Sequence, residues 1–333
     1  MFEIDSHRPE SQTLITFIVT CYSLDRLFDV IELIESISSQ PYGSSEIVLV
    51  VERNQRLFQK LVSHYDDDHS VHLKLVHCST PLGLSLARNL GLRFAAGKII
   101  AFVDDDVTLQ PGWITETHRT YQADGQIIGI SGRAIPVLMD ETLNWFPRQL
   151  HWLIGSTEYA HVETIVEVRN AHGMNMSFKR EVFDMGLRFR ESTGMRSRDK
   201  QAHSKFPSED VDLSIRARFA TGGKIVYNPR VCVRHKLAAD KMTLRHMFSR
   251  AFFVGRQRRM IRLSYGNLED DALKPEKTLL RRLPRGILMG TFNGWLRRPS
   301  WTIRRICFTT VVLCLVALGY VTCIPQEWND AKA

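Results

Sequence analysis

The sequence predicts an α/β fold with a mostly parallel sheet flanked by helices, followed by basic amphipathic helices and one C-terminal transmembrane helix. Over the first hundred residues, short apolar segments rich in β-branched residues alternate with segments of helical periodicity. The apolar segments are continuous rather than alternating with polar residues, which is typical of parallel strands covered on both faces. Near the C-terminus, a run of 19 residues carries no charge.

Four strands and three helices account for the N-terminal part of the chain. The expected strands are 14–20 (LITFIVT), 46–51 (EIVLVV), 71–76 (VHLKLV) and 98–103 (KIIAFV). The expected helices are 24–40, a polar stretch after the second strand, and 84–96. In such a sheet the ligand binds beyond the carboxyl ends of the strands. We therefore seek the chemistry in the residues that directly follow each strand.

Asp104, Asp105 and Asp106 directly follow the fourth strand. Three adjacent carboxylates repel one another unless a cation or hydrogen-bond donors compensate. Mg²⁺ or Mn²⁺ does so while keeping positions open for phosphate oxygens. The triplet alone is equally typical of a solvated acidic turn, because Asp also favours turns. Its position at a strand end favours the metal site.

Two later segments add side chains that could act with the triplet. Ser208, Glu209 and Asp210 precede an expected helix, where a carboxylate could serve as a general base. The same residues suit a helix N-terminus, with Ser208 as the cap, and both roles can hold at once. His235 follows another apolar strand and is either a third metal ligand or a structural histidine.

The formal net charge of +8 is concentrated in one segment. Residues 234–305 hold 18 Lys and Arg against 5 Asp and Glu, whereas 1–233 hold 25 against 29. Within this segment, 244–263 mixes phenylalanines with arginines, which is typical of a basic amphipathic helix at an anionic membrane surface. The stretch 279–298 is interrupted by Pro and Gly and is either an interfacial helix or a linker. Nucleic-acid binding is the competing interpretation of this charge, but no nucleic-acid motif accompanies it.

The uncharged run covers 306–324 (ICFTTVVLCLVALGYVTCI). At about 1.5 Å per residue it extends roughly 28 Å, close to the thickness of a bilayer core. A transmembrane helix is the favoured interpretation, and a buried core helix is the alternative. Arginines precede the run and acidic residues dominate the tail that follows. The positive-inside rule therefore predicts a single-pass protein of the cell membrane, with its catalytic domain on the cytoplasmic side.

These observations divide the chain into four parts. We expect a catalytic α/β domain in 1–240, a basic amphipathic juxtamembrane region in 241–305, a transmembrane helix in 306–324 and a short tail in 325–333. The six cysteines lack metal-ligand spacing, which indicates a reduced compartment.

Seven segments, which together span about residues 1–260, resemble the glycosyltransferases of family 2, whose fold is called GT-A. In order they are FIVTCYS, EIVLVVERN, LGLSLARNLGLRFAAGKIIAFVDDDV, GISGRAIP, HGMNMSFKREVF, SEDVDLSIRA and VRHK. The stretch NWFPRQLHWLIGSTEY is similar to membrane-associated transferases of archaeal-type N-glycosylation and their bacterial relatives. The resemblance implies an inverting, metal-dependent hexosyltransferase. It would move a sugar from a nucleotide-sugar donor, expected to be a UDP-sugar, to a hydroxyl or phosphate acceptor in glycan or polysaccharide assembly.

The resemblance also implies roles for individual residues. Nucleotide-sugar binding falls to Thr20, Tyr22, Glu52, Arg88, Asn89, Asp104 and Asp105. The loop beside the donor sugar and the acceptor holds Gly173, Met174, Asn175 and Glu209. Asp210 matches the catalytic base. The expected ligands of the divalent cation, Mn²⁺ or Mg²⁺, are Asp104, Asp106 and His235.

The expected partners are a nucleotide-sugar donor, an acceptor glycan or a polyprenyl phosphate or pyrophosphate lipid, and the membrane, but no nucleic acid. Two other function classes fit part of the sequence. A sugar nucleotidyltransferase also uses a nucleotide-binding α/β sheet and acidic metal ligands, although no Gly-rich loop bearing Lys or Arg follows the first strand. A non-catalytic membrane scaffold that kept the fold is the second alternative.

Overall fold

The computed structural model describes residues 14–41, 44–66, 71–137, 146–157, 162–190, 209–237, 242–265 and 299–323. The chain forms two compact units. The first comprises 1–134, 163–204 and 208–235, and the second comprises 135–162, 205–207 and 236–333. The expected cap at Ser208, the stretch 279–298 and the tail 325–333 lie outside the described residues, and the four-part division of the chain remains a prediction.

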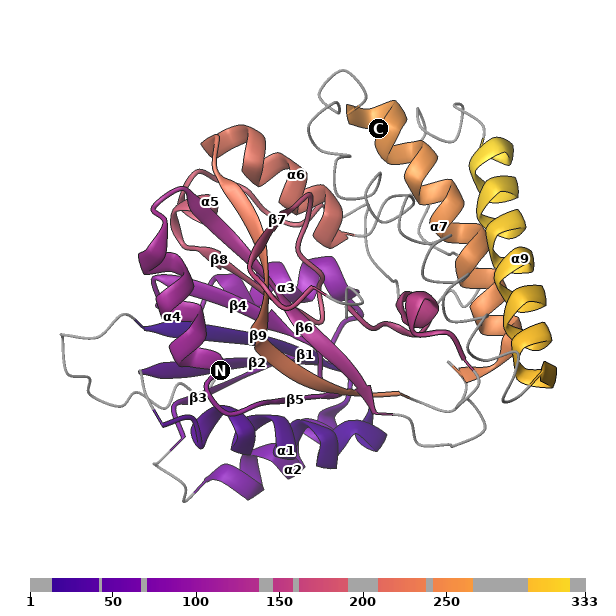
Figure 1. The fold of residues 1–333 in the computed structure, drawn as a ribbon. Coiled ribbons are helices and arrows are strands. Elements are labelled where there is room, and N and C mark those ends of the chain that lie inside the picture. Colours follow the sequence, from indigo (N-terminus) through magenta and orange to yellow (C-terminus); the bar gives the residue numbers. More distant parts are fainter. Residues whose placement is uncertain are drawn as a thin grey trace. The chain divides into compact units, whose positions relative to one another are not determined.

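The first unit is built on a nine-stranded sheet with the strand order β3-β2-β1-β4-β8-β6-β9-β5, in which β7 also pairs with β9 (Figure 1). The strands are β1 (Ile15–Cys21), β2 (Ser45–Glu52), β3 (Leu73–Cys78), β4 (Ile99–Val103), β5 (Val107–Leu109), β6 (Ile127–Val137), β7 (Val166–Val168), β8 (Asn175–Lys179) and β9 (Lys224–Lys236). The helices are η1 (Leu24–Arg26), α1 (Leu27–Ser38), α2 (Gln55–Tyr65), α3 (Leu84–Leu92), α4 (Trp113–Ala123), α5 (Glu181–Asp184) and α6 (Glu209–Thr221).

The N-terminal half of the sheet is parallel, as the continuous apolar runs predict. Strand β1 pairs with β2 and β4, and β2 pairs with β3, all in parallel. Phe17 is fully buried in the same core cluster as Leu33 of α1, whereas Gly91 of α3 contacts the side chain of the adjacent strand residue Ile18. Because successive strand side chains point to opposite faces, helices cover both faces of the sheet. The carboxyl ends of β1, β2 and β4 therefore share one edge.

The second half of the sheet is antiparallel, so the sheet as a whole is mixed. Strand β8 lies between β4 and β6, and β9 pairs with both β5 and β7. The register sets Asn175 opposite Val103 and His235 opposite Val107. Val103 and Val107 directly precede and follow the Asp triplet in the chain. The antiparallel strands thus bring the start of β8 and the end of β9 to the edge where β4 ends.

The second unit contains η3 (Arg148–Ile154), α7 (Leu244–Tyr265) and α9 (Pro299–Thr322), and α7 and α9 lie side by side (Figure 1). The rings of Phe248 and Phe308 stack at 5.5 Å, and Arg262 of α7 donates to the hydroxyl of Tyr320. These contacts follow the same order along both helices, so the helices run in parallel. Between them, a Cβ atom added at Gly255 would overlap the Val316 carbonyl oxygen, which shows that the two backbones touch.

Helix α9 begins at Pro299, several residues before the uncharged run, because Arg304 and Arg305 continue the helix. Its segment Ser300–Thr322 is long and apolar enough to cross a membrane by length and composition. Ile303, Leu318 and Val321 are among its exposed apolar side chains. Helix α7 matches the helix expected over 244–263, with Met247, Ala251 and Gly255 buried at a spacing of four residues.

Candidate active site

The Asp triplet lies at the carboxyl end of β4, and its members face different surroundings. The Asp104 side chain is 35% exposed, whereas that of Asp106 is 5% exposed. Burial and repulsion from Asp106 raise the pKa of Asp105 to about 6, with Asp104 adding to the repulsion. The carboxylates at this strand end are therefore close enough that Asp105 binds its proton more tightly than an isolated aspartate does.

Arg88 of α3 connects the triplet to the start of α6. It is buried, and its guanidinium donates to Asp104 Oδ1 at 3.1 Å and to Glu209 Oε1 at 3.0 Å. It also donates to the carbonyl oxygen of Gly173 at 2.9 Å. The side chain lies over the rings of Phe102 and Phe189. One guanidinium therefore holds three segments that are distant in the sequence, because its fork of donors can satisfy several acceptors at once.

Asp210 is fixed at the N-terminus of α6 by backbone donors. Its Oδ2 accepts from the N–H of Gly173 at 2.8 Å, and its Oδ1 accepts from the N–H of Val211 at 2.8 Å. The negative charge suits this end of the helix dipole. Gly173 thus joins Asp210 through its N–H and Arg88 through its carbonyl. The structure therefore brings together five residues to which the family resemblance assigned roles, namely Arg88, Asp104, Gly173, Glu209 and Asp210.

Glu209 is buried beside Asp210, and its proton affinity is altered. Burial raises its pKa to about 7, and repulsion from Asp210 acts in the same direction, while Arg88 opposes both. In the unfolded chain, this carboxyl has its ordinary pKa of 4.5. Between about pH 4.5 and pH 7 the folded chain keeps a proton that the unfolded chain releases, so this group makes the fold less stable as the pH rises through that window.

Replacing Glu209 with Gln is expected to remove this pH dependence. The unfolding free energy of Glu209→Gln, relative to the unmodified protein, should rise between pH 5 and pH 7 by about 2 kcal/mol, because Gln has no charge to desolvate. Urea unfolding at pH 5, 6, 7 and 8 would measure it. Glu181→Gln is the matched control, since the Glu181 side chain is 60% exposed. If the unfolding free energies of Glu209→Gln and the unmodified protein differed by the same amount at every pH, the expectation would be contradicted.

Asp106 lies between two basic side chains. His235 Nε2 is 3.2 Å from Asp106 Oδ1, and Arg26 Nη2 is 3.2 Å from Asp106 Oδ2. The position of His235 follows from the β5–β9 register, which pairs it with Val107. Sequence reasoning did not single out Arg26. The sequence feature that could have indicated Arg26 is its position five residues beyond β1, in the connection that leaves the ligand-binding edge of the sheet.

Asp104, Asp106 and His235 are chemically suited to a divalent cation but do not converge on one point. In the described part of the chain, no three His, Cys, Asp or Glu side chains form a group that could hold a metal ion as placed. Asp104 points to Arg88, whereas Asp106 is between Arg26 and His235. The donors nevertheless fit Mn²⁺ or Mg²⁺, since carboxylate oxygens are preferred by both ions. Burial and then repulsion from Asp106 raise the pKa of Asp105, and a cation would relieve the repulsion.

The residues predicted to bind the nucleotide lie at the same edge with different exposure. Tyr22 is 57% exposed and Thr20 is half-buried at the end of β1. Glu52 is buried, and its Oε2 accepts from the N–H groups of Leu82 and Gly83, which holds the loop before α3. Asn89 exchanges two hydrogen bonds with the backbone of Phe189.

The family resemblance implies that Met174 and Asn175 lie in a loop beside the donor sugar, but in the structure their side chains are directed into the protein. Asn175 is completely buried, and its amide accepts from Trp113 Nε1 and donates to the carbonyls of Arg133 and Val231. These three bonds occupy the side chain within the sheet. Met174 is half-buried and packs against the core. As placed, Asn175 supports the site by holding β8 to its neighbours rather than by lining it.

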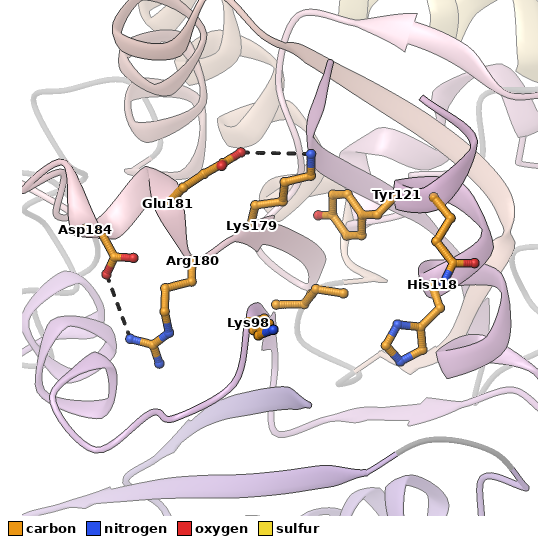
Figure 2. A pocket seen from close by; sticks show the side chains of 9 residues that line it. Lys98, His118, Tyr121, Lys179, Arg180, Glu181 and Asp184 are labelled. Carbon is orange, nitrogen blue, oxygen red and sulfur yellow. Dashed lines mark ion pairs between the residues drawn. The ribbon is translucent and has the colours of Figure 1, made fainter. Parts of the chain in front are cut away.

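A separate cavity of about 380 Å³ lies at the opposite end of β4, beside Lys98 and Ile99 (Figure 2). It is lined by Lys98, Ile99, His118, Tyr121, Gln122, Lys179, Arg180, Glu181 and Asp184. Figure 2 shows Lys179 directed to Glu181 and Arg180 to Asp184. Arg180 also donates to the carbonyls of Ala95 and Gly97, and so joins β8 to the loop before β4. None of the predicted site residues lies in this cavity.

Known proteins are similar to this chain in sequence and in fold. A glucosyl-dolichyl phosphate glucuronosyltransferase of Haloferax volcanii is 29% identical over 311 residues, covering 92% of this chain and 95% of the relative. The succinoglycan biosynthesis protein ExoM of Rhizobium meliloti is 25% identical over 183 residues, covering 54% of this chain and 53% of the relative.

Solved structures show the GT-A fold. A mannosyltransferase from Pyrobaculum calidifontis, in complex with GDP-Man and Mn²⁺, aligns with a TM-score of 0.57 and 16% identity over 92% of this chain and 87% of that one. S. aureus TarS 1-349 with UDP-GlcNAc aligns with a TM-score of 0.52 and 15% identity over 95% and 92%. The sequence model of the glycosyl transferase family 2 matches residues 17–186, about half of the chain. The protein therefore belongs to glycosyl transferase family 2 and is a glycosyltransferase with the GT-A fold.

Proposed function

We propose that this protein is an inverting, metal-dependent glycosyltransferase that moves a sugar from a nucleotide-sugar donor to a lipid-linked acceptor. The observation that carries the proposal is the connection from Asp210 through Gly173 and Arg88 to Asp104. It joins a carboxylate suited to proton abstraction with the carboxylates suited to the donor diphosphate. Membership of the family favours this activity over nucleotidyl transfer and over a non-catalytic scaffold.

Asp210 is the proposed general base. Each of its oxygens accepts one backbone hydrogen bond and keeps a second lone pair, so the carboxylate is held in place and can still take a proton. It removes the proton from the acceptor hydroxyl, and the acceptor oxygen then forms a bond to the anomeric carbon. The bond from that carbon to the nucleoside diphosphate breaks on the opposite face. This single displacement inverts the configuration and needs no covalent enzyme intermediate.

Asp104, Asp106 and His235 are the side chains we propose for the divalent cation. When bound, such a cation neutralises the charge that grows on the leaving diphosphate. The proposal rests on the carboxylates at the end of β4 and on the 3.2 Å distance between His235 and Asp106. The solved mannosyltransferase of the same fold contains Mn²⁺.

A lipid-linked acceptor is favoured by the relative and by the second unit. The Haloferax volcanii relative is named for a glucosyl-dolichyl phosphate acceptor. Helix α9 is apolar enough to enter a membrane, and α7 beside it carries arginines suited to anionic headgroups. We propose a sugar hydroxyl of a glycan linked to polyprenyl phosphate or pyrophosphate as the acceptor, a UDP-sugar as the donor, and a catalytic domain on the cytoplasmic side.

A donor and acceptor screen tests this function. The purified full chain would be incubated with UDP-sugars and GDP-mannose, each with glucosyl-dolichyl phosphate or with a soluble glucoside, and nucleoside diphosphate release would be measured with Mn²⁺, Mg²⁺ or EDTA. We expect transfer to the lipid-linked acceptor from a UDP-sugar, with loss of activity in EDTA and inversion seen by NMR of the product. Transfer to soluble acceptors alone would overturn the lipid assignment, and a product of retained configuration would overturn the single displacement.

A further inference from the structure

The buried carboxylate of Asp106 has a basic side chain beside each of its two oxygens. The Asp106 side chain is 5% exposed, with Arg26 Nη2 3.2 Å from Oδ2 and His235 Nε2 3.2 Å from Oδ1. The two basic groups come from different elements, since Arg26 ends η1 after β1 and His235 lies on β9. Asp106 is therefore neutralised by the protein itself on the side that faces the β1 connection.

Arg26 has a second carboxylate within reach. Its Nη1 donates to Asp29 Oδ2 at 3.1 Å, one turn further along in α1. The side chains of Arg26 and Asp29 are 24% and 22% exposed, so both are accessible to solvent. The guanidinium is thus placed between a buried carboxylate and a more exposed one. It can leave Asp106 without leaving its ion pair with Asp29.

A divalent cation bound to Asp106 Oδ2 would share that oxygen with the Arg26 guanidinium, whose Nη2 is 3.2 Å away. The two positive charges would repel strongly at such a short distance in a partly buried site. An arginine does not lose its proton in proteins, so Arg26 cannot relieve the repulsion by becoming neutral. The repulsion is relieved if the guanidinium moves away from Oδ2.

We propose that Arg26 is a positioning residue that acts as an internal counter-ion of Asp106, and that a divalent cation binds by displacing Arg26 toward Asp29. This inference rests on the proposed function in one respect, namely that Asp106 is a metal ligand. In this arrangement Arg26 offsets the repulsion between the carboxylates at the end of β4, and so stabilises the folded site before the cation binds. The same contact lowers the affinity of the site for the cation.

Direct measurement of Mn²⁺ binding tests the inference without donor or acceptor. Free Mn²⁺ would be followed by electron paramagnetic resonance in titrations of the full chain in detergent. We expect Arg26→Gln to bind Mn²⁺ more tightly than the unmodified protein, by about tenfold, because the competing charge is gone. Arg26→Lys keeps a cation and should remain close to the unmodified protein. The rise in Tm on adding Mn²⁺ should also be larger for Arg26→Gln.

Two further variants separate the possible outcomes. Arg119→Gln removes an equally charged side chain that is 65% exposed on α4, and should leave Mn²⁺ affinity unchanged if the effect belongs to Asp106. Asp106→Asn should weaken Mn²⁺ binding with either Arg or Gln at position 26. If Arg26→Gln binds Mn²⁺ no more tightly while Asp106→Asn loses it, the metal site stands and the counter-ion role is refuted. If Asp106→Asn binds Mn²⁺ normally, the proposed metal ligand itself is refuted, and the inference with it.

Discussion

Asp210→Asn is expected to lower the rate of sugar transfer by a factor on the order of 10² to 10⁴, because that is the usual contribution of a positioned general base. The amide nitrogen of Asn cannot take a proton from the acceptor hydroxyl. Binding of the nucleoside diphosphate should change little, since Asp210 contacts Gly173 and Val211 rather than the Asp triplet. Steady-state kinetics and calorimetric titration of UDP with Mn²⁺ would measure the two effects separately.

Asp212 provides a matched control on the same helix. It is buried and paired with Arg190 and Arg216, so Asp212→Asn removes a carboxylate of similar burial two residues away. We expect that variant to lose stability but to keep the turnover of its folded fraction. A transfer rate for Asp210→Asn within tenfold of the unmodified protein would exclude Asp210 as the base. Glu209, with its raised pKa, would then be the carboxylate to test.

Arg88→Met is expected to have the largest effect on stability, about 3–5 kcal/mol, because removing one partner leaves the buried carboxylate of Glu209 without its cation. Glu209 loses its 3.0 Å ion pair and Asp104 its 3.1 Å ion pair. Transfer should fall as well, since the same guanidinium holds the carbonyl of Gly173, whose N–H fixes Asp210. Urea unfolding and kinetics of the folded fraction would report the two losses.

The double variant Arg88→Met, Glu209→Gln distinguishes this explanation from a simple packing defect. If the cost comes from an uncompensated charge, Glu209→Gln should raise the unfolding free energy more in the Arg88→Met background than in the unmodified protein. Asp184→Asn combined with Arg88→Met is the control, because the Asp184 side chain is 63% exposed and lies on α5, paired with Arg180. An equal gain from Glu209→Gln in both backgrounds would show that Arg88 acts through its contacts with Phe102 and Phe189 instead.

The parallel half of the sheet could be predicted from the sequence because its strands are apolar runs with clear ends. The structure moves the ends of the four predicted strands by two residues or fewer, and Asp104 follows β4 as expected. Arg88 and Asp104, to both of which the family resemblance assigned nucleotide-sugar binding, form a 3.1 Å ion pair. Local pattern was sufficient for these features, since each depends on residues close together in the chain.

The remaining parts of the site depend on contacts between distant segments. His235 reaches Asp106 only through the register of β5 and β9, and no local pattern encodes that register. Arg26 could not be recognised without the turn at η1 that directs it to Asp106. Asn175 shows the same dependence, because its motif predicts a ligand-binding loop, whereas its amide accepts from Trp113 and donates to two backbone carbonyls of distant strands. A motif identifies the residue type but not the direction in which the side chain points.

The contact between α7 and α9 limits the depth at which α9 can enter a bilayer. Arg262 donates to the Tyr320 hydroxyl and Arg259 lies over its ring, so this end of α9 is bound to charges that belong to its neighbour. From Arg305 to Tyr320 the helix rises only about 22 Å, less than the roughly 30 Å of a hydrocarbon core. A bilayer that holds α9 upright must therefore thin around the pair, or the arginines must extend to the headgroups. In the membrane anchor that we propose, the charges on α7 set the usable length as much as the apolar residues of α9 do.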